Sequence, residues 1–336
     1  MAASTQPQET TLWIDGDRAA VAGAVVETMG PALSVLAVGG PRESAVDRLA
    51  HDLERPRIDD LRKLLVDYPA TYLLIATRST ISAELLAVAA EQQTTVVTLE
   101  PVAGSLAEWA SLGQPLSEAT VPPTRPILPR IVNMPAFLDG PGFFRAAEPG
   151  ESLGPGRLIS FHATGVAEQG SLLSRLFDAW RTILHFADTP ESIDASLAGS
   201  AVVPDALRQA KGRLGAHARM PDGAGATLAV TDRAGRAERR LEAIGEQAHL
   251  TVTDTDYTLH QIGGALIDHH RSPEGPMSYV ALIADQWHRL IDRPKTPRGK
   301  TDAIQQARAL ACCEASLLSA RTGQPENPRK LMEMHR

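Results

Sequence analysis

The chain has 336 residues, of which 43% are hydrophobic and 22% charged, a composition that argues against disorder, collagen and coiled coils. The net charge is −7 and there is no long basic run, which speaks against a nucleic-acid-binding role. No stretch approaches the roughly 20 apolar residues of a membrane-spanning helix, and the first residues lack a signal-peptide pattern. The length predicts two domains.

The first hundred residues alternate between apolar runs and helical patterns. Continuous apolar strands separated by amphipathic helices indicate a parallel sheet that is covered on both faces. We expect strands at 11–14, 33–38, 71–77 and 94–99, and helices at 19–29, 43–53, 59–66 and 79–91. Asp59 and Ser79 are the expected N-caps of the last two helices. The sequence therefore predicts a Rossmann-like, doubly wound α/β domain over residues 1–125.

The second half of the chain has a different pattern. Four prolines in residues 121–129 place a domain boundary near residue 125. Beyond it we expect an α+β domain over residues 126–322, with a mostly antiparallel open sheet and a last helix that packs back on the first domain. The expected strands are 158–163, 215–220, 226–231, 237–244, 249–253 and 257–260, and the expected helices are 170–187, 277–291 and 301–321. Residues 323–336 read as a polar tail.

Cysteine and histidine usage gives little sign of a metal site. Neighbouring cysteines such as Cys312 and Cys313 rarely form an unstrained disulfide, and two are too few for a zinc site. We interpret them as small helix residues of a reduced, cytoplasmic protein. The run Asp268-His269-His270 reads as a surface loop, because adjacent histidines point in different directions. No metal is predicted.

Four segments in order along the chain resemble motifs of the Gfo/Idh/MocA family of sugar and inositol oxidoreductases. They are ATRSTISAE at 76–84, VVTLEPVAGS at 96–105, SLLSRLFDAWRTILHFADTPESI at 171–193 and ACCEASLLSARTG at 311–323. The resemblance implies an N-terminal domain that binds NAD(P) and a C-terminal sheet that forms the substrate cleft and often an oligomer face. In that family a lysine in an Glu-Lys-Pro motif, with an aspartate and a histidine on one helix, supports hydride and proton transfer.

The expected phosphate loop departs from this pattern. A dinucleotide site uses Gly-x-Gly-x-x-Gly between the first strand and its helix. Here Asp15 and Asp17 occupy the first two glycine positions around Gly16, and Arg18 follows. A carboxylate about 4 Å from a phosphate charge costs about 4 kcal/mol at an effective dielectric of 20. Arg18 would offset part of this repulsion, or the segment is an ordinary strand-to-helix turn with an aspartate cap.

The residues at the ribose position and at the end of the third strand also differ from the family pattern. Gly40 stands where an acidic residue would hold the ribose hydroxyls. Arg42 could meet an NADP phosphate, but it is more simply a surface residue near a helix start. Thr77, Arg78 and Ser79 replace the family's Thr-Pro-Asn, and these positions would contact a cofactor only if one binds.

The catalytic positions have changed identity too. Glu100 replaces the lysine, or the lysine is deleted, and a carboxylate cannot supply the positive charge and donors of an ammonium group. On the helix motif, Ser174 replaces the first aspartate, Asp178 the histidine and Arg181 the second aspartate. Asp178 and Arg181, three residues apart, could form an ion pair on one helix face, or could surround a cleft together with Glu100.

Five departures in separate motifs predict a degenerate member of the family, a pseudoenzyme of carbohydrate metabolism that needs no cofactor. It would bind a sugar-like ligand, or form a homo-oligomer or a hetero-oligomer with an active relative through its C-terminal sheet. One alternative is an active sugar, polyol or inositol dehydrogenase in which Gly16, Arg18, Gly39 and Gly40 still hold NAD or NADP and Glu100 or Asp178 serves as the base. Another is a cofactor-free lyase or isomerase that uses Glu100 and Asp178 as acid and base.

Overall fold

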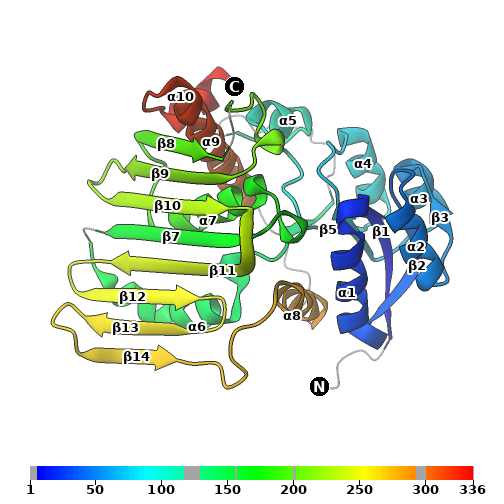
Figure 1. The fold of residues 1–336 in the computed structure, drawn as a ribbon, viewed down its shortest axis with the longest axis horizontal. Coiled ribbons are helices and arrows are strands. Elements are labelled where there is room, and N and C mark those ends of the chain that lie inside the picture. The colour runs from blue at the N-terminus through cyan, green and yellow to red at the C-terminus, as the bar shows by residue number, and fades with distance from the viewer. Residues whose placement is uncertain (1–5, 117–128, 156, 200–201, 293–299, 336) are drawn as a thin grey trace.

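The computed structural model describes residues 6–116, 129–155, 157–199, 202–292 and 300–335. They form two sheets with helices, which lie beside one another in Figure 1, the first in blue and cyan and the second in green and yellow. The predicted fold class is confirmed: a Rossmann-like parallel sheet is joined to an α+β unit with a mostly antiparallel sheet. Within the described residues, no helix has the length and apolar character needed to cross a bilayer.

The first sheet has six strands, all paired in parallel, in the order β3-β2-β1-β4-β5-β6. The strands are β1 (Gln8–Ile14), β2 (Leu33–Gly39), β3 (Arg57–Ile58), β4 (Tyr72–Ala76), β5 (Thr95–Thr98) and β6 (Ile131–Asn133). The strand order reverses between β1 and β4. In sheets of this kind the crevice at the carboxyl ends of those two strands is where ligands bind.

Helices cover both faces of the first sheet, because its strands are apolar on both sides. The strand residues Leu12 and Leu74 share one core with α1 (Ala19–Met29), α2 (Ser44–Asp52) and α8 (Tyr279–Asp292). The alternate residues Leu73 and Ile75 share the other core with α3 (Leu61–Asp67), α4 (Ala83–Glu91) and α5 (Leu106–Ser111). Helix α8 thus returns from the far end of the sequence to complete one face of the first sheet (Figure 1).

Two predicted helix caps were misplaced. The cap of α3 is Asp60 rather than Asp59, and its carboxylate accepts a hydrogen bond from the Lys63 N–H at 2.9 Å. The cap of α4 is Ser82 rather than Ser79. Both helices begin later than predicted, since a cap must precede the first helical turn directly to reach its free N–H groups.

The second sheet has eight strands in the order β14-β13-β12-β11-β7-β10-β9-β8. They are β7 (Leu158–Val166), β8 (Ser192–Ala198), β9 (Arg213–Arg219), β10 (Gly225–Thr231), β11 (Arg233–Ile244), β12 (Ala248–Thr253), β13 (Tyr257–Gln261) and β14 (Leu266–His270). Only β7 and β10 pair in parallel. The residues Asp268–His270, expected in a surface loop, lie instead in the edge strand β14, which pairs with β13.

One face of this sheet is covered by helices and the other is open. Inward residues such as Phe161, Leu241 and Leu250 are buried, while their strand neighbours are partly exposed. The covering helices are α6 (Pro141–Gly150), α7 (Leu172–Phe186) and α9 (Lys300–Thr322). Alternating burial is the pattern of an antiparallel sheet with a single packed face.

The domain limits are less simple than a linker suggests. The boundary predicted near residue 125 lies in 117–128, outside the described residues. Strand β6 follows it, yet still extends the first sheet by pairing with β5. The segment 323–336, expected as a polar tail, contains α10 (Pro328–Met334), which Asn327 caps and in which Met332 is buried. Helix α9 reaches the first domain, because the Leu106 N–H donates to Glu314 at 2.8 Å.

Candidate functional site

The turn after β1 is held by Asp15. One carboxylate oxygen accepts from the Thr77 hydroxyl at 2.7 Å, and the other from the Arg78 N–H at 2.9 Å. Asp15 therefore joins the carboxyl ends of β1 and β4 and makes no side-chain cap bond to the short 3₁₀ turn Gly16–Arg18 that leads into α1. The carboxylate stands at the switch point of the sheet, where a phosphate loop would begin.

Acidic groups also occupy the rest of this turn. The Gly16 N–H donates to the Glu43 carboxylate at 2.9 Å, and a Cβ at Gly16 would lie 2.1 Å from that oxygen. Asp17 is half exposed and forms an ion pair with Arg78 at 3.3 Å. The backbone donor that a phosphate would need is thus already used by a carboxylate from the start of α2.

Arg18 does not face solvent or the phosphate position. Its side chain is 1% exposed and forms an ion pair with Glu100, which is 2% exposed. Glu100 also accepts from the Ser171 N–H at 2.9 Å and from the Ser171 hydroxyl. Glu100, the residue at the family's lysine position, is therefore part of a buried cluster. The cluster joins the turn Gly16–Arg18, the end of β5 and the N-cap of α7.

The helix motif residues Asp178 and Arg181 have different partners on neighbouring elements. The Asp178 carboxylate accepts from Arg239 on β11 at 2.8 Å and from the Phe137 N–H at 2.9 Å. Arg181 instead points toward Asp302, 4.0 Å away, and the ring of Phe177. The predicted Asp178–Arg181 pair is therefore wrong. Helix α7 lies between the sheet and α9, so side chains three residues apart meet different neighbours.

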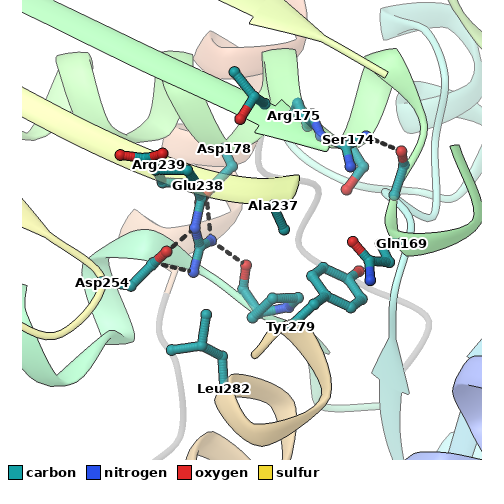
Figure 2. A pocket seen from close by; sticks show the side chains of 13 residues that line it. Gln169, Ser174, Arg175, Asp178, Ala237, Glu238, Arg239, Asp254, Tyr279 and Leu282 are labelled. Atoms are coloured by element: carbon teal, nitrogen blue, oxygen red, sulfur yellow. Dashed lines mark hydrogen bonds and ion pairs between the residues drawn. The ribbon is translucent and has the colours of Figure 1, made fainter. Parts of the chain in front are cut away.

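Arg239 is the centre of this second cluster, as Figure 2 shows. Besides Asp178 it binds Asp254 at 2.6 Å and the Pro135 carbonyl at 2.7 Å. Burial acts to lower the pKa of Arg239, but the charges of Asp254 and Asp178 outweigh it and raise the pKa. The guanidinium is therefore permanently charged and firmly held by two carboxylates.

A small pocket lies beside these residues (Figure 2). Ser174, Arg175, Asp178, Arg239 and Tyr279 are among its lining residues. Its volume is about 30 Å³, which is room for roughly two water molecules. Burial raises the pKa of Tyr279 to about 12, so its phenol is neutral and does not act as a base near pH 7. The cavity in this arrangement is too small for a sugar.

The remaining predicted cofactor residues make contacts within the protein. Arg42 has an 87% exposed side chain and pairs with Asp59 at 2.7 Å. Gly40 packs directly against β1, since a Cβ there would lie 2.1 Å from the Ile14 carbonyl oxygen. The Thr77 hydroxyl accepts from the Ser79 N–H at 3.0 Å and thereby shapes the turn after β4.

The sequence interpretation missed Ser171, Arg239, Asp254 and Tyr279. The alternating pattern of β11 could have indicated Arg239. This residue shares the inward face of the strand with Leu241, so it is a charged side chain directed into the core, which needs a counter-ion. No local signal marks the other three as site residues, since their roles depend on distant segments. Among the described residues, no group of three metal-binding side chains is present.

No family model and no curated protein matches this sequence. Similar solved structures are nevertheless found over nearly the whole chain. An oxidoreductase from Agrobacterium radiobacter in complex with NAD⁺, L-tartaric acid and magnesium is 14% identical, with 96% of this chain and 99% of that chain covered and a TM-score of 0.66. The chain therefore shares the two-domain fold of these oxidoreductases. The predicted resemblance is confirmed at the level of the fold.

Two further neighbours are named for an activity or a pathway. Levoglucosan dehydrogenase, in complex with NADH and L-sorbose, is 14% identical, covers 96% of this chain and 99% of its own, and has a TM-score of 0.67. GenD2 from gentamicin A biosynthesis, in complex with NAD, is 17% identical, covers 97% and 98%, and has a TM-score of 0.66. At identities this low, the structural similarity establishes the fold alone, and the chemistry has to be inferred from the residues of the site.

The residues at the switch point do not fit a dinucleotide. A pyrophosphate there would face the carboxylates of Asp15, Asp17 and Glu43, and Glu43 already accepts the Gly16 N–H. Arg18, the cation closest in sequence, is committed to Glu100 inside the protein. Fixed negative charge and an occupied backbone donor both oppose phosphate binding.

Proposed function

We propose that this protein is a non-catalytic member of the oxidoreductase fold that binds no NAD(P) and acts as a ligand-binding or partner subunit. The buried Glu100 cluster carries this proposal. Glu100 stands in the position of the catalytic lysine, so the ammonium group of that lysine is missing. The oxygens of the Glu100 carboxylate are engaged by Arg18 and Ser171.

The charge at the switch point supports the same conclusion. Among the described residues, Arg78 is the one cation paired with Asp17, while Asp15 is bonded to the Arg78 N–H and to the Thr77 hydroxyl. The alternative of a cofactor-free lyase needs two free carboxylates that act together. Glu100 and Asp178 instead have separate arginine partners, Arg18 and Arg239.

The partner surface we propose is the open face of the second sheet. The strand register places Leu158, Ile244, His249, His260 and Leu266 in one row across five strands. The three aliphatic members are 50%, 37% and 53% exposed. A row of exposed apolar side chains on an uncovered sheet face is typical of an association surface. The proposed occupant is a second copy of this chain, with an active relative as the alternative.

The test of the cofactor proposal is titration with NAD⁺, NADH, NADP⁺ and NADPH by calorimetry and thermal shift. We expect no saturable binding up to millimolar concentration. The variant Asp17→Asn with Glu43→Gln removes two carboxylates and should bind more tightly than the wild type, whereas the exposed Glu9→Gln should behave like the wild type. Micromolar binding by the wild type would instead favour an active dehydrogenase, as the NAD complexes of the neighbours suggest.

The test of the partner surface is the molar mass in solution. We expect a dimer or larger assembly by size-exclusion chromatography with light scattering. Leu158→Lys with Leu266→Lys should produce the monomer without loss of thermal stability, while the exposed Val66→Lys on α3 should not change the mass. A monomeric wild type that also fails to bind an active relative would refute this surface.

A further inference from the structure

A second cavity lies where the first domain meets the closing helices. Its walls come from α5, the 3₁₀ turn Leu207–Gln209, α9 and α10, which gather at the top of Figure 1. It shares no lining residue with the pocket of Figure 2. Its volume is about 290 Å³, roughly twice the engineered 150 Å³ cavity that holds benzene. A molecule of about ten heavy atoms would fit.

Part of the wall is apolar. Leucines from three elements contribute to it: Leu207, Leu317, Leu318 and Leu331. Leu207 and Leu317 are buried, and the other two are half-buried. A small molecule with a hydrocarbon body would gain free energy by covering this surface, at roughly 25 cal/mol per Å² of apolar area removed from water.

The arginines of the wall already have partners. Arg208 donates to Glu108 at 3.0 Å, to the Val102 carbonyl at 3.0 Å and to the Arg78 carbonyl at 3.2 Å. At the rim, Arg321 forms an ion pair with Asp205 at 2.6 Å. Both guanidinium groups therefore already have a carboxylate partner, with which an anionic ligand would have to compete.

The remaining acidic residue of the cavity wall is Glu314. One of its oxygens accepts the Leu106 N–H at 2.8 Å, and among the described residues it forms no ion pair with a lysine or an arginine. Burial raises its pKa and the Glu108 carboxylate adds to the rise, while the Leu106 N–H and the charge of His335 act against it, so the cost of burying the carboxylate is only partly compensated. A ligand that supplies a positive charge would relieve that cost.

We propose that this cavity binds a small organic ammonium ion, a primary amine with an apolar body of about ten heavy atoms. The leucines would cover the hydrocarbon part and Glu314 would pair with the ammonium group. An anion would be repelled by Glu314, and a neutral apolar molecule would bury that carboxylate further without satisfying it. This inference does not depend on the proposed loss of NAD(P) binding.

The experiment is calorimetry at pH 8 on the full chain with 2-phenylethylamine and, as its uncharged counterpart of equal size, 2-phenylethanol. We expect the amine to bind at least tenfold more tightly than the alcohol. Glu314→Gln keeps an acceptor for the Leu106 N–H and should weaken the amine at least tenfold with little effect on the alcohol. Glu333→Gln, an exposed change on the neighbouring helix α10, should have no effect.

A second variant tests the cavity itself and does not depend on the behaviour of Glu314. Leu318→Trp fills the space, so it should abolish amine binding while circular dichroism and the melting temperature show a folded protein. The proposal is overturned by equal affinity for amine and alcohol, by unchanged amine binding in Glu314→Gln, or by no binding of the amine up to about 10 mM.

Discussion

The buried Arg18–Glu100 pair makes a quantitative prediction about stability. Both side chains are almost fully buried, at 1% and 2% exposure, and Ser171 supplies the other bonds to Glu100. Glu100→Gln retains the shape but leaves the Arg18 charge without a counter-ion. Breaking a buried pair in this way costs about 3–5 kcal/mol. We expect the lower end of this range, because the amide oxygen can still accept one hydrogen bond.

The measurement is urea and thermal unfolding followed by circular dichroism. About 3 kcal/mol corresponds to a melting temperature lower by roughly 6–12 °C for a unit of 150–250 residues. The double variant Arg18→Met, Glu100→Leu removes both charges together and should be more stable than Glu100→Gln alone, since buried pairs can be replaced by apolar residues at little cost. Glu84→Gln, which breaks the exposed pair with Arg62, serves as the matched control.

Two results would refute this reasoning. A Glu100→Gln protein as stable as the wild type would mean that the pair is hydrated and not buried as described. A double variant that is less stable than Glu100→Gln by several kcal/mol would mean that the charges themselves stabilise the fold. Unchanged stability in the Glu84→Gln control is required for either comparison.

Three more predictions concern Asp178, His185 and the two cysteines. Asp178→Asn should lower the unfolding free energy by about 2 kcal/mol in urea titrations, because one charge-assisted bond to Arg239 is lost, and no change would contradict the pair. Partial desolvation of His185 against its neighbours and the charge of Arg157 lower its pKa below 6.5, so the unfolded state takes up a proton first and stability should fall as the pH drops below about 6.5. His185→Gln should lessen this dependence in thermal melts, and an identical slope would count against it. Burial raises the pKa of Cys312 and Cys313, so a disulfide reagent should react with neither thiol until the protein unfolds, whereas rapid native labelling would refute their burial.

The sequence alone determined four of the six strands of the first sheet, while the strand order and the short strands β3 and β6 came only with the structure. Continuous apolar runs such as 33–38 and 71–77 favour strands buried on both faces, and those became β2 and β4. The helix 19–29 was predicted with the bounds of α1, since its apolar pattern begins and ends sharply. Strands β8 and β14 and helices α5 and α6 were missed, because short or mixed patterns such as theirs become ordered only by packing against other elements.

The sequence also determined which chemical groups are missing. The carboxylates at the glycine positions and the loss of the lysine follow from residue identity, which no folding can change. What Glu100 and Asp178 do instead was decided by the tertiary structure. Their arginine partners lie 82 and 61 residues away in the chain. Local spacing suggested the i, i+3 pair of Asp178 and Arg181, but each side chain found a partner on another element, Arg239 for Asp178 and Asp302 for Arg181. A buried charge takes the best counter-ion that the fold brings to it, and that choice is made across elements rather than along one of them.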